Sequence, residues 1–278
     1  MAQRAFLSVV IGSIIAGLTG IIIKNISVPA SSIAFVRTAL PTAILAIWMM
    51  NRRITFFRGN YKRMLLASVL NAIRMYLFLT AFIYTSITQA VIMLFTWPIF
   101  VNILSSFWLK EKISVKQLIT LLMAFSGIVI IYGNQSFNLD NRDFIGMSAG
   151  ILSALFYSIS YIIYKTEIDN FHRNEIIFYQ NLVGGFVFLP FFFFINPWPQ
   201  LNDFPLLITY GILMGIVIFN FFFYGLKYLK ASQASMIAYV EIISAVATGI
   251  IFMGDELSPQ ILVGGLCILV SIYLIRRT

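Results

Sequence analysis

The chain alternates ten long apolar stretches with short polar or basic segments. A helix that crosses the bilayer core needs about 20 mainly apolar residues. Only 10% of the residues are charged, whereas soluble domains carry about 25%. The sequence therefore predicts an all-α integral membrane protein rather than a soluble domain. The ten predicted transmembrane spans cover residues 5–23, 31–50, 63–84, 86–107, 115–133, 144–164, 175–195, 204–224, 232–253 and 260–275.

Basic residues are distributed unevenly between the two sides of this predicted bundle. Of the 19 Lys and Arg residues, 15 lie at the two termini and in alternate loops, and only Lys24 and Arg142 lie in the other loops. Because basic loops remain cytoplasmic, we expect both termini on the inner side of a cytoplasmic membrane. The first stretch is longer than the core of about 7–15 residues of a signal peptide, which favours a spanning helix over a cleaved leader.

The chain also repeats itself weakly at an offset of 144 residues. Chance similarity between apolar helices is the alternative explanation, but the matches include polar residues at one common offset. Phe78, Tyr84, Thr88, Gln89 and Ala90 match Phe222, Tyr228, Ser232, Gln233 and Ala234, and residues 109–114 match residues 253–258.

Each half, 1–134 and 135–278, then holds five spans. Because five is odd, the second half enters the membrane from the opposite side. We therefore expect two inverted five-helix repeats around a central cavity. Inverted repeats are typical of many secondary transporters, in which the substrate binds near the midplane between the halves.

Several motifs resemble those of the drug/metabolite transporter superfamily, in its ten-helix EamA-type form. They are the Tyr-x-x-x-Thr/Ser-Gln-Ala stretch, the turn from Leu109 to Ser114, Pro98 in the fourth span and the run from Phe35 to Arg37. The chain departs from the pattern at three positions. Lys110 replaces a glycine, Asp255 stands where glutamate is usual, and Ile242 replaces a proline, which leaves open whether the ninth span is broken.

The resemblance covers both halves and implies a cavity lined by spans one to four and six to nine. It also implies transport without ATP, often as export, coupled to a proton or to exchange. The expected partners are a small-molecule substrate and the lipid bilayer, with no nucleic acid and no cofactor, in a monomer or homodimer.

Three ionisable residues lie inside predicted spans, namely Arg37, Arg74 and Glu241. Such residues are unfavourable in a bilayer and are therefore functional candidates. Arg74, Trp97 and Glu241 lie at the middle of their spans, in one layer, where they suit a zwitterion such as an amino acid. Glu241 is also the candidate for proton coupling. Alternatively, Arg74 and Glu241 form a structural ion pair, and Arg37 extends to the outer interface.

Polar residues elsewhere in the spans are weaker candidates for substrate contact. Packing between helices is the alternative role for each of them. Glu111, Asp255 and Glu256, at the ends of spans, are interpreted as solvated turn residues. The weaker substrate-binding candidates are Tyr76, Asn102, Tyr157, Tyr161, Gln180 and Asn220.

Other function classes find little support in the sequence. Cys267 and His172 are single residues of their kinds, so neither an intrachain disulfide nor a multi-histidine metal site is possible. No span holds histidine or a pair of aspartates, which argues against intramembrane proteases. A channel and a non-transporting scaffold remain alternatives. Within transport, a quaternary ammonium ion or polyamine is the alternative substrate, because Glu241, Trp97 and tyrosines resemble half of an aromatic cage.

Overall fold

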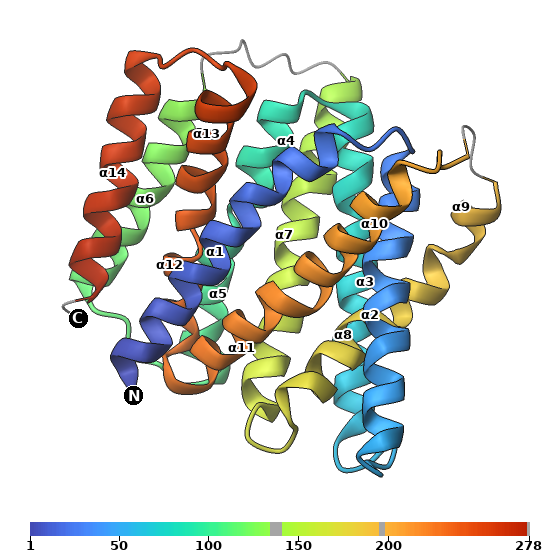
Figure 1. Cartoon of the computed structure of the whole chain (residues 1–278). Coiled ribbons are helices and arrows are strands. Elements are labelled where there is room, and N and C mark those ends of the chain that lie inside the picture. The colour runs from blue at the N-terminus through green and yellow to red at the C-terminus, as the bar shows by residue number, and fades with distance from the viewer. Residues whose placement is uncertain (134–140, 195–197, 277–278) are drawn as a thin grey trace.

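The computed structural model describes residues 1–133, 141–194 and 198–276, and all regular elements in these ranges are helices. The helices form one bundle (Figure 1). The first helix begins and the last one ends toward the same, lower end of the bundle in this view. We call this end the terminal face.

The first half contains six helices for five predicted spans, because the fourth span is broken at Phe95 and Thr96. Ser86 and Ser114 accept the backbone N–H groups of Gln89 and Gln117 and so begin the fourth and sixth helices. The helices are α1 (Ala2–Lys24), α2 (Ala30–Asn51), α3 (Tyr61–Tyr84), α4 (Ile87–Leu94), α5 (Trp97–Trp108) and α6 (Val115–Tyr132).

The second half is more fragmented, with three of its predicted spans divided into shorter elements. The eighth span contains a π-helical turn, which locally widens the hydrogen-bonding pattern. The elements are α7 (Asn141–Glu167), α8 (Arg173–Val187), α9 (Leu189–Phe193), α10 (Asp203–Ile212), η1 (Leu213–Val217), α11 (Ile218–Tyr228), α12 (Ala231–Ile237), α13 (Val240–Met253) and α14 (Pro259–Arg276).

Within the described residues, eight helical segments are long and apolar enough to cross a membrane. A ninth segment, Pro259–Ile275, is apolar but shorter. The predicted seventh span, 175–195, is divided at Phe188 between α8 and α9, and its last residue lies outside the described ranges. The protein is thus all-helical with eight to ten apolar helices. The predicted boundary between the halves, at residues 134 and 135, falls partly on residues that are not described.

The offset of 144 residues also separates corresponding helices. The first residues of α4 and α12 are 87 and 231, and those of α6 and α14 are 115 and 259. In Figure 1, α1 runs upward from the terminal face whereas α7 runs downward. Packing is exchanged between the halves as well, since α3 packs on α7 while α1 packs on α10, η1 and α11.

The ninth span is broken although it lacks the proline of the related pattern. Its break at Ala238 and Tyr239 faces the break of the fourth span, because the Tyr239 hydroxyl donates to the Phe95 carbonyl over 2.9 Å. A broken helix leaves backbone groups without intrahelical partners, and these need other partners inside a membrane. Phe95 and Tyr239 are themselves 144 residues apart, so each break lies against its counterpart.

Candidate functional site

Arg74 lies on the inner side of α3 and is only 7% exposed. Its guanidinium group stacks on the ring of Tyr157, 4.5 Å from the ring centre. Nη2 lies 3.5 Å from Asn71 Oδ1, and Nε has no hydrogen-bond partner among the described residues. Asn71 in turn donates to the carbonyl of Gln180. Arg74 is therefore held by stacking, with hydrogen-bonding capacity left over.

Glu241 lies in the first turn of α13, directly after the break in the ninth span. In the described part of the chain, its carboxylate forms no ion pair and accepts no hydrogen bond. Two basic groups act on this carboxylate electrostatically, Arg37 more strongly than Arg74. The alternative of a direct ion pair between Arg74 and Glu241 is not what the structure contains.

Arg37 is half-buried on α2 and belongs to the same electrostatic group, although the sequence also allowed it to extend to the outer interface. At Arg37, α2 also packs closely on the π-helical turn. A Cβ atom added to Gly215 would overlap the ring of Pro41 and would lie 2.8 Å from the Arg37 carbonyl oxygen. Only glycine at position 215 allows this approach of the two backbones.

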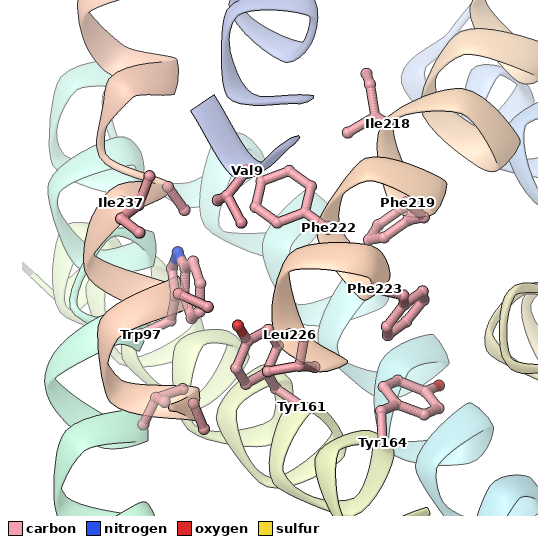
Figure 2. Close-up of a cluster of buried hydrophobic side chains, with 14 of the residues drawn as sticks. Val9, Trp97, Tyr161, Tyr164, Ile218, Phe219, Phe222, Phe223, Leu226 and Ile237 are labelled. Carbon is pink, nitrogen blue, oxygen red and sulfur yellow. The ribbon is translucent and has the colours of Figure 1, made fainter. Parts of the chain in front are cut away.

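An aromatic wall adjoins Arg74. The Trp97 ring lies 4.9 Å from Tyr157 and 5.4 Å from Tyr161, centre to centre. Figure 2 shows Trp97 and Tyr161 together on one side of a buried cluster, with Tyr164 against Phe223 on the other. Two of the predicted substrate-binding candidates, Tyr157 and Tyr161 of α7, thus lie against the first residue of α5.

Several buried polar atoms near these residues have no hydrogen-bond partner in the described structure. They are Arg74 Nε, the hydroxyl groups of Tyr161 and Tyr164, and Gln180 Oε1. An unsatisfied buried polar group is unfavourable by about 1–3 kcal/mol. A bound molecule with polar groups would satisfy them, so this region is the candidate binding site.

Three other predicted site residues lie elsewhere. Tyr76 is 53% exposed and lies beside Ile73 on the outer surface of α3. Because it comes two residues after Arg74, its side chain points roughly 200° around the helix axis from that of Arg74. Asn102 is buried between α5 and α6, where it donates to the Pro98 carbonyl and accepts from Gln117. Asn220 bonds to Asn174 and Arg173 near the start of α8.

Glu111 is the residue whose role the sequence interpretation missed. Instead of being solvated in its turn, its carboxylate accepts the backbone N–H groups of Ala231 (2.7 Å) and Ser232 (3.1 Å) and the Ser232 hydroxyl (2.6 Å). A residue of the first half therefore caps the N-terminus of α12 in the second half. Lys165 of α7 binds the same turn between α11 and α12, since its ammonium group donates to the carbonyls of Leu226 and Leu229.

Asp255 is the counterpart of Glu111 in the second half, 144 residues later. The two turns contain equivalent backbone hydrogen bonds. The Glu111 N–H donates to the Ser105 carbonyl and the Asp255 N–H donates to the Gly249 carbonyl, each at 3.1 Å. In the described structure, however, the exposed Asp255 side chain forms no hydrogen bond to α4 and lies against Gly249 of the preceding helix, α13. The Glu111 contact therefore has no equivalent at Asp255, although other hydrogen bonds join the halves at the opposite face, such as that from the Ser27 N–H to the Asp203 carboxylate at 3.1 Å.

Ion pairs reinforce the terminal face. Arg58 binds Glu175 through two hydrogen bonds of 2.7 and 2.6 Å, which raise the pKa of Arg58. Arg63 pairs with Glu167 at 3.1 Å. Both pairs join the start of α3, or the loop before it, to the second half.

Comparisons with known proteins agree with this architecture. The profile of the EamA-like transporter family matches residues 3–133 and 144–277. An uncharacterized transporter of Archaeoglobus fulgidus is 26% identical over 274 residues, which are 97% of this chain and 95% of that protein. The pseudopaline exporter CntI of Pseudomonas aeruginosa is 24% identical over 284 residues, which cover 100% of this chain and 98% of that protein.

A solved crystal structure superposes on this one with a TM-score of 0.80, covering 98% of this chain and 96% of the other at 14% identity. It shares the fold. The two family matches span nearly the whole chain, and the apolar helices enclose charges without ion pairs. The protein is therefore a multi-pass membrane transporter of the drug/metabolite superfamily and belongs to the EamA-like transporter family.

Proposed function

We propose that this protein is a secondary transporter that exports an amino acid or a similar zwitterion. The observation that carries the proposal is the group formed by Arg37, Arg74 and Glu241. These charges lie inside membrane-spanning helices close enough to interact, yet no ion pair joins them. A substrate with a carboxylate and an ammonium group supplies the missing partners.

Each residue has a role in this proposal. The guanidinium groups of Arg37 and Arg74 bind the substrate carboxylate, because guanidinium and carboxylate groups form paired hydrogen bonds. Glu241 binds the ammonium group. The wall of Trp97, Tyr157 and Tyr161 encloses the carbon skeleton, while Gln180 Oε1 and the Tyr161 hydroxyl offer hydrogen bonds.

A quaternary ammonium or polyamine substrate fits this arrangement less well. An aromatic cage binds such a cation through free ring faces. Here Arg74 itself occupies the face of Tyr157 at 4.5 Å. With Glu241 ionised, the two arginines leave the group with a net positive charge, which repels a cation and attracts a carboxylate.

Alternating access between two inverted repeats, residues 1–134 and 135–278, moves the substrate in this proposal. The central cavity opens to one side when the other side is tied. Glu111 ties the terminal face, which we take as cytoplasmic from the excess of basic residues. The structure then corresponds to a state closed toward the cytoplasm. Breaking the Glu111 contacts and forming an equivalent Asp255 contact at α4 would give the opposite state.

Export driven by protons or by exchange accords with two further points. A relative over the full length of the chain is named as an exporter. Glu241, which forms no ion pair, can take up a proton when the substrate leaves, a role that intramembrane acids have in many pumps and transporters.

Substrate flux into proteoliposomes tests the proposal, with amino acids and quaternary amines as probes. We expect Arg74→Gln to reduce amino-acid flux at least tenfold, because a charge-assisted hydrogen bond contributes about 1.5–3 kcal/mol. Glu241→Gln should abolish dependence on the proton gradient. Lys24→Gln, an equal charge change at the exposed end of α1, is the control and should leave flux unchanged.

The alternatives predict different outcomes. Loss of amine flux in Glu241→Gln, with Arg74→Gln unaffected, would support a cation transporter instead. Flux that does not saturate with substrate would indicate a channel. No flux and no thermal shift with any probe would indicate a scaffold, since a ligand at 100 times its dissociation constant adds about 2.7 kcal/mol to folding stability.

A further inference from the structure

A cleft of about 600 Å³ lies on the side of the bundle between α1 and α11, near the terminal face. It is distinct from the charged group around Arg74, none of whose members line it. Its walls include Arg4, Leu7 and Ile11 of α1, Arg173 of α8, and Ile216 and Phe221 of η1 and α11.

The cleft is amphipathic along its length. Arg4 and Arg173 lie at the terminal end, at the first turns of α1 and α8. Leu7 and Ile11 follow on successive turns of α1 toward the membrane interior, and both are exposed at the surface of the bundle. The basic end thus meets the headgroup region of the bilayer while the apolar end meets the acyl chains.

The two arginines have no acidic partner in the described structure. No Asp or Glu lines the cleft. The acidic residues of the terminal face are otherwise engaged, since Glu175 binds Arg58, Glu167 binds Arg63, and Asp169 binds Lys227 at 3.3 Å. The positive charge of the cleft is therefore not neutralised from within.

Arg173 is positioned for an external anion. Its Nη1 donates to the Asn220 carbonyl over 3.3 Å, and the guanidinium lies over the ring of Tyr224 at 5.2 Å. A guanidinium has five N–H donors, so most of them remain available after this contact. The stacked ring fixes the plane of the group without neutralising its charge.

We propose that this cleft is a binding site for an anionic phospholipid. The phosphate lies between Arg4 and Arg173, and one acyl chain runs along Leu7, Ile11 and Ile216. Basic pockets between membrane helices on the cytoplasmic side bind anionic lipid headgroups in this manner. The apolar wall, which a free phosphate ion would leave uncovered, distinguishes a lipid from a soluble anion.

Occupancy of the site would favour one arrangement of the transporter. The cleft joins α1 to α11, and the Ser8 hydroxyl already donates to the Phe221 carbonyl across this contact. Helix α1 also packs on α13, which carries Glu241. A lipid that bridges Arg4 and Arg173 therefore stabilises the packing of α1 in the observed state.

Native mass spectrometry of the full chain, titrated with phosphatidylglycerol or phosphatidylcholine, tests the proposal. We expect phosphatidylglycerol to bind more tightly, and Arg4→Gln and Arg173→Gln each to weaken its binding about fivefold, because each basic residue near a membrane surface contributes about 1 kcal/mol to attraction of anionic lipid. Ile11→Ser should weaken both lipids. Lys112→Gln, an exposed basic residue of the same face, is the control and should have no effect.

Three results would overturn the proposal. They are equal binding of the two lipids, an equal loss in Lys112→Gln, and equally tight binding of glycerol 3-phosphate, which has no acyl chains. Arg4 lies in the exposed first turn of α1, so Arg4→Gln is expected to fold normally and keeps the test valid if Arg173→Gln does not. The measurement does not involve substrate flux, so its outcome is independent of the proposed function.

Discussion

Glu111→Gln is predicted to open the terminal face. The carboxylate accepts three hydrogen bonds at the N-terminus of α12, of 2.7, 3.1 and 2.6 Å. An amide retains one accepting oxygen and loses the charge that interacts with the helix dipole. Loss of a helix cap is unfavourable by about 0.5–2 kcal/mol and loss of the dipole interaction by about 0.3–1 kcal/mol. The two contributions sum to about 1–3 kcal/mol. Because the amide keeps one accepting oxygen, we expect the lower part of this range, about 1–2 kcal/mol, which shifts the equilibrium between closed and open states by roughly five- to thirtyfold.

Thiol labelling measures this shift directly. Ser235 is fully buried in α12, one turn beyond the Glu111 contact. We would replace Cys267 with serine, introduce Ser235→Cys as the reporter, and follow its reaction with a membrane-impermeant reagent added from the side of the terminal face. Labelling should accelerate by the same five- to thirtyfold in Glu111→Gln. The matched control is Asp255→Asn, the same charge change at the counterpart position, which should not accelerate labelling, because Asp255 forms no cross-half contact in the observed state and would form one only in the opposite state.

A purely structural role for Glu111 would give a different result. If the melting temperature of Glu111→Gln falls while the labelling rate of the reporter stays constant, Glu111 only caps α12 and does not control access. Equal acceleration by Asp255→Asn would also refute the reasoning, because in the described structure that side chain forms no hydrogen bond or ion pair with the opposite half.

Three further predictions concern stability. Gly17→Ala should lower the free energy of unfolding by about 1–3 kcal/mol, measured by thermal unfolding, because the added Cβ would lie 2.5 Å from α13. Gly20→Ala is the control and should not lower it, because its Cβ would meet no atom within 4 Å. Arg58→Gln should be unfavourable by about 1–2 kcal/mol, since it leaves the buried Glu175 without its ion pair; an unchanged melting temperature would contradict this. His172 accepts the Asn174 N–H through Nδ1, and burial lowers its pKa. Because the folded state favours neutral His172, the protein should lose stability as the pH falls below about 6.5. The loss should be less than about 1 kcal/mol, since the side chain is largely exposed. A His172→Gln variant should not show this loss.

Two residues of the candidate site could be selected from the sequence because ionisable residues are rare in membrane spans. Ionisable residues in apolar stretches are few, so Arg74 and Glu241 stand out in the sequence without any knowledge of packing. Their direct pairing was only one alternative, and the structure separates them. The inclusion of Arg37 in the same group depends on how α2 is placed relative to the helices that carry Arg74 and Glu241, which no local pattern indicates.

The side of a helix on which a residue lies was harder to predict than its depth in the membrane. Tyr76 is two positions from Arg74 and therefore points to another side of α3. Depth in the membrane, which the sequence provides, places both residues in the same layer. The side of the helix that faces the interior is set by its neighbours, so the sequence could not show that Tyr76 lies on the exposed side of α3.

The sequence by itself determined the membrane class, the approximate spans and the offset of 144 residues between corresponding segments. These properties depend on hydrophobicity, charge and similarity, which are summed along the chain and do not require knowledge of which helices touch. Only the tertiary structure decided that the ninth span is broken opposite the fourth, that Glu111 caps a helix of the other half, and that the interior charges have no ion pairs. The first two depend on contacts between residues more than 100 positions apart. Such contacts are fixed by the crossing and rotation of packed helices.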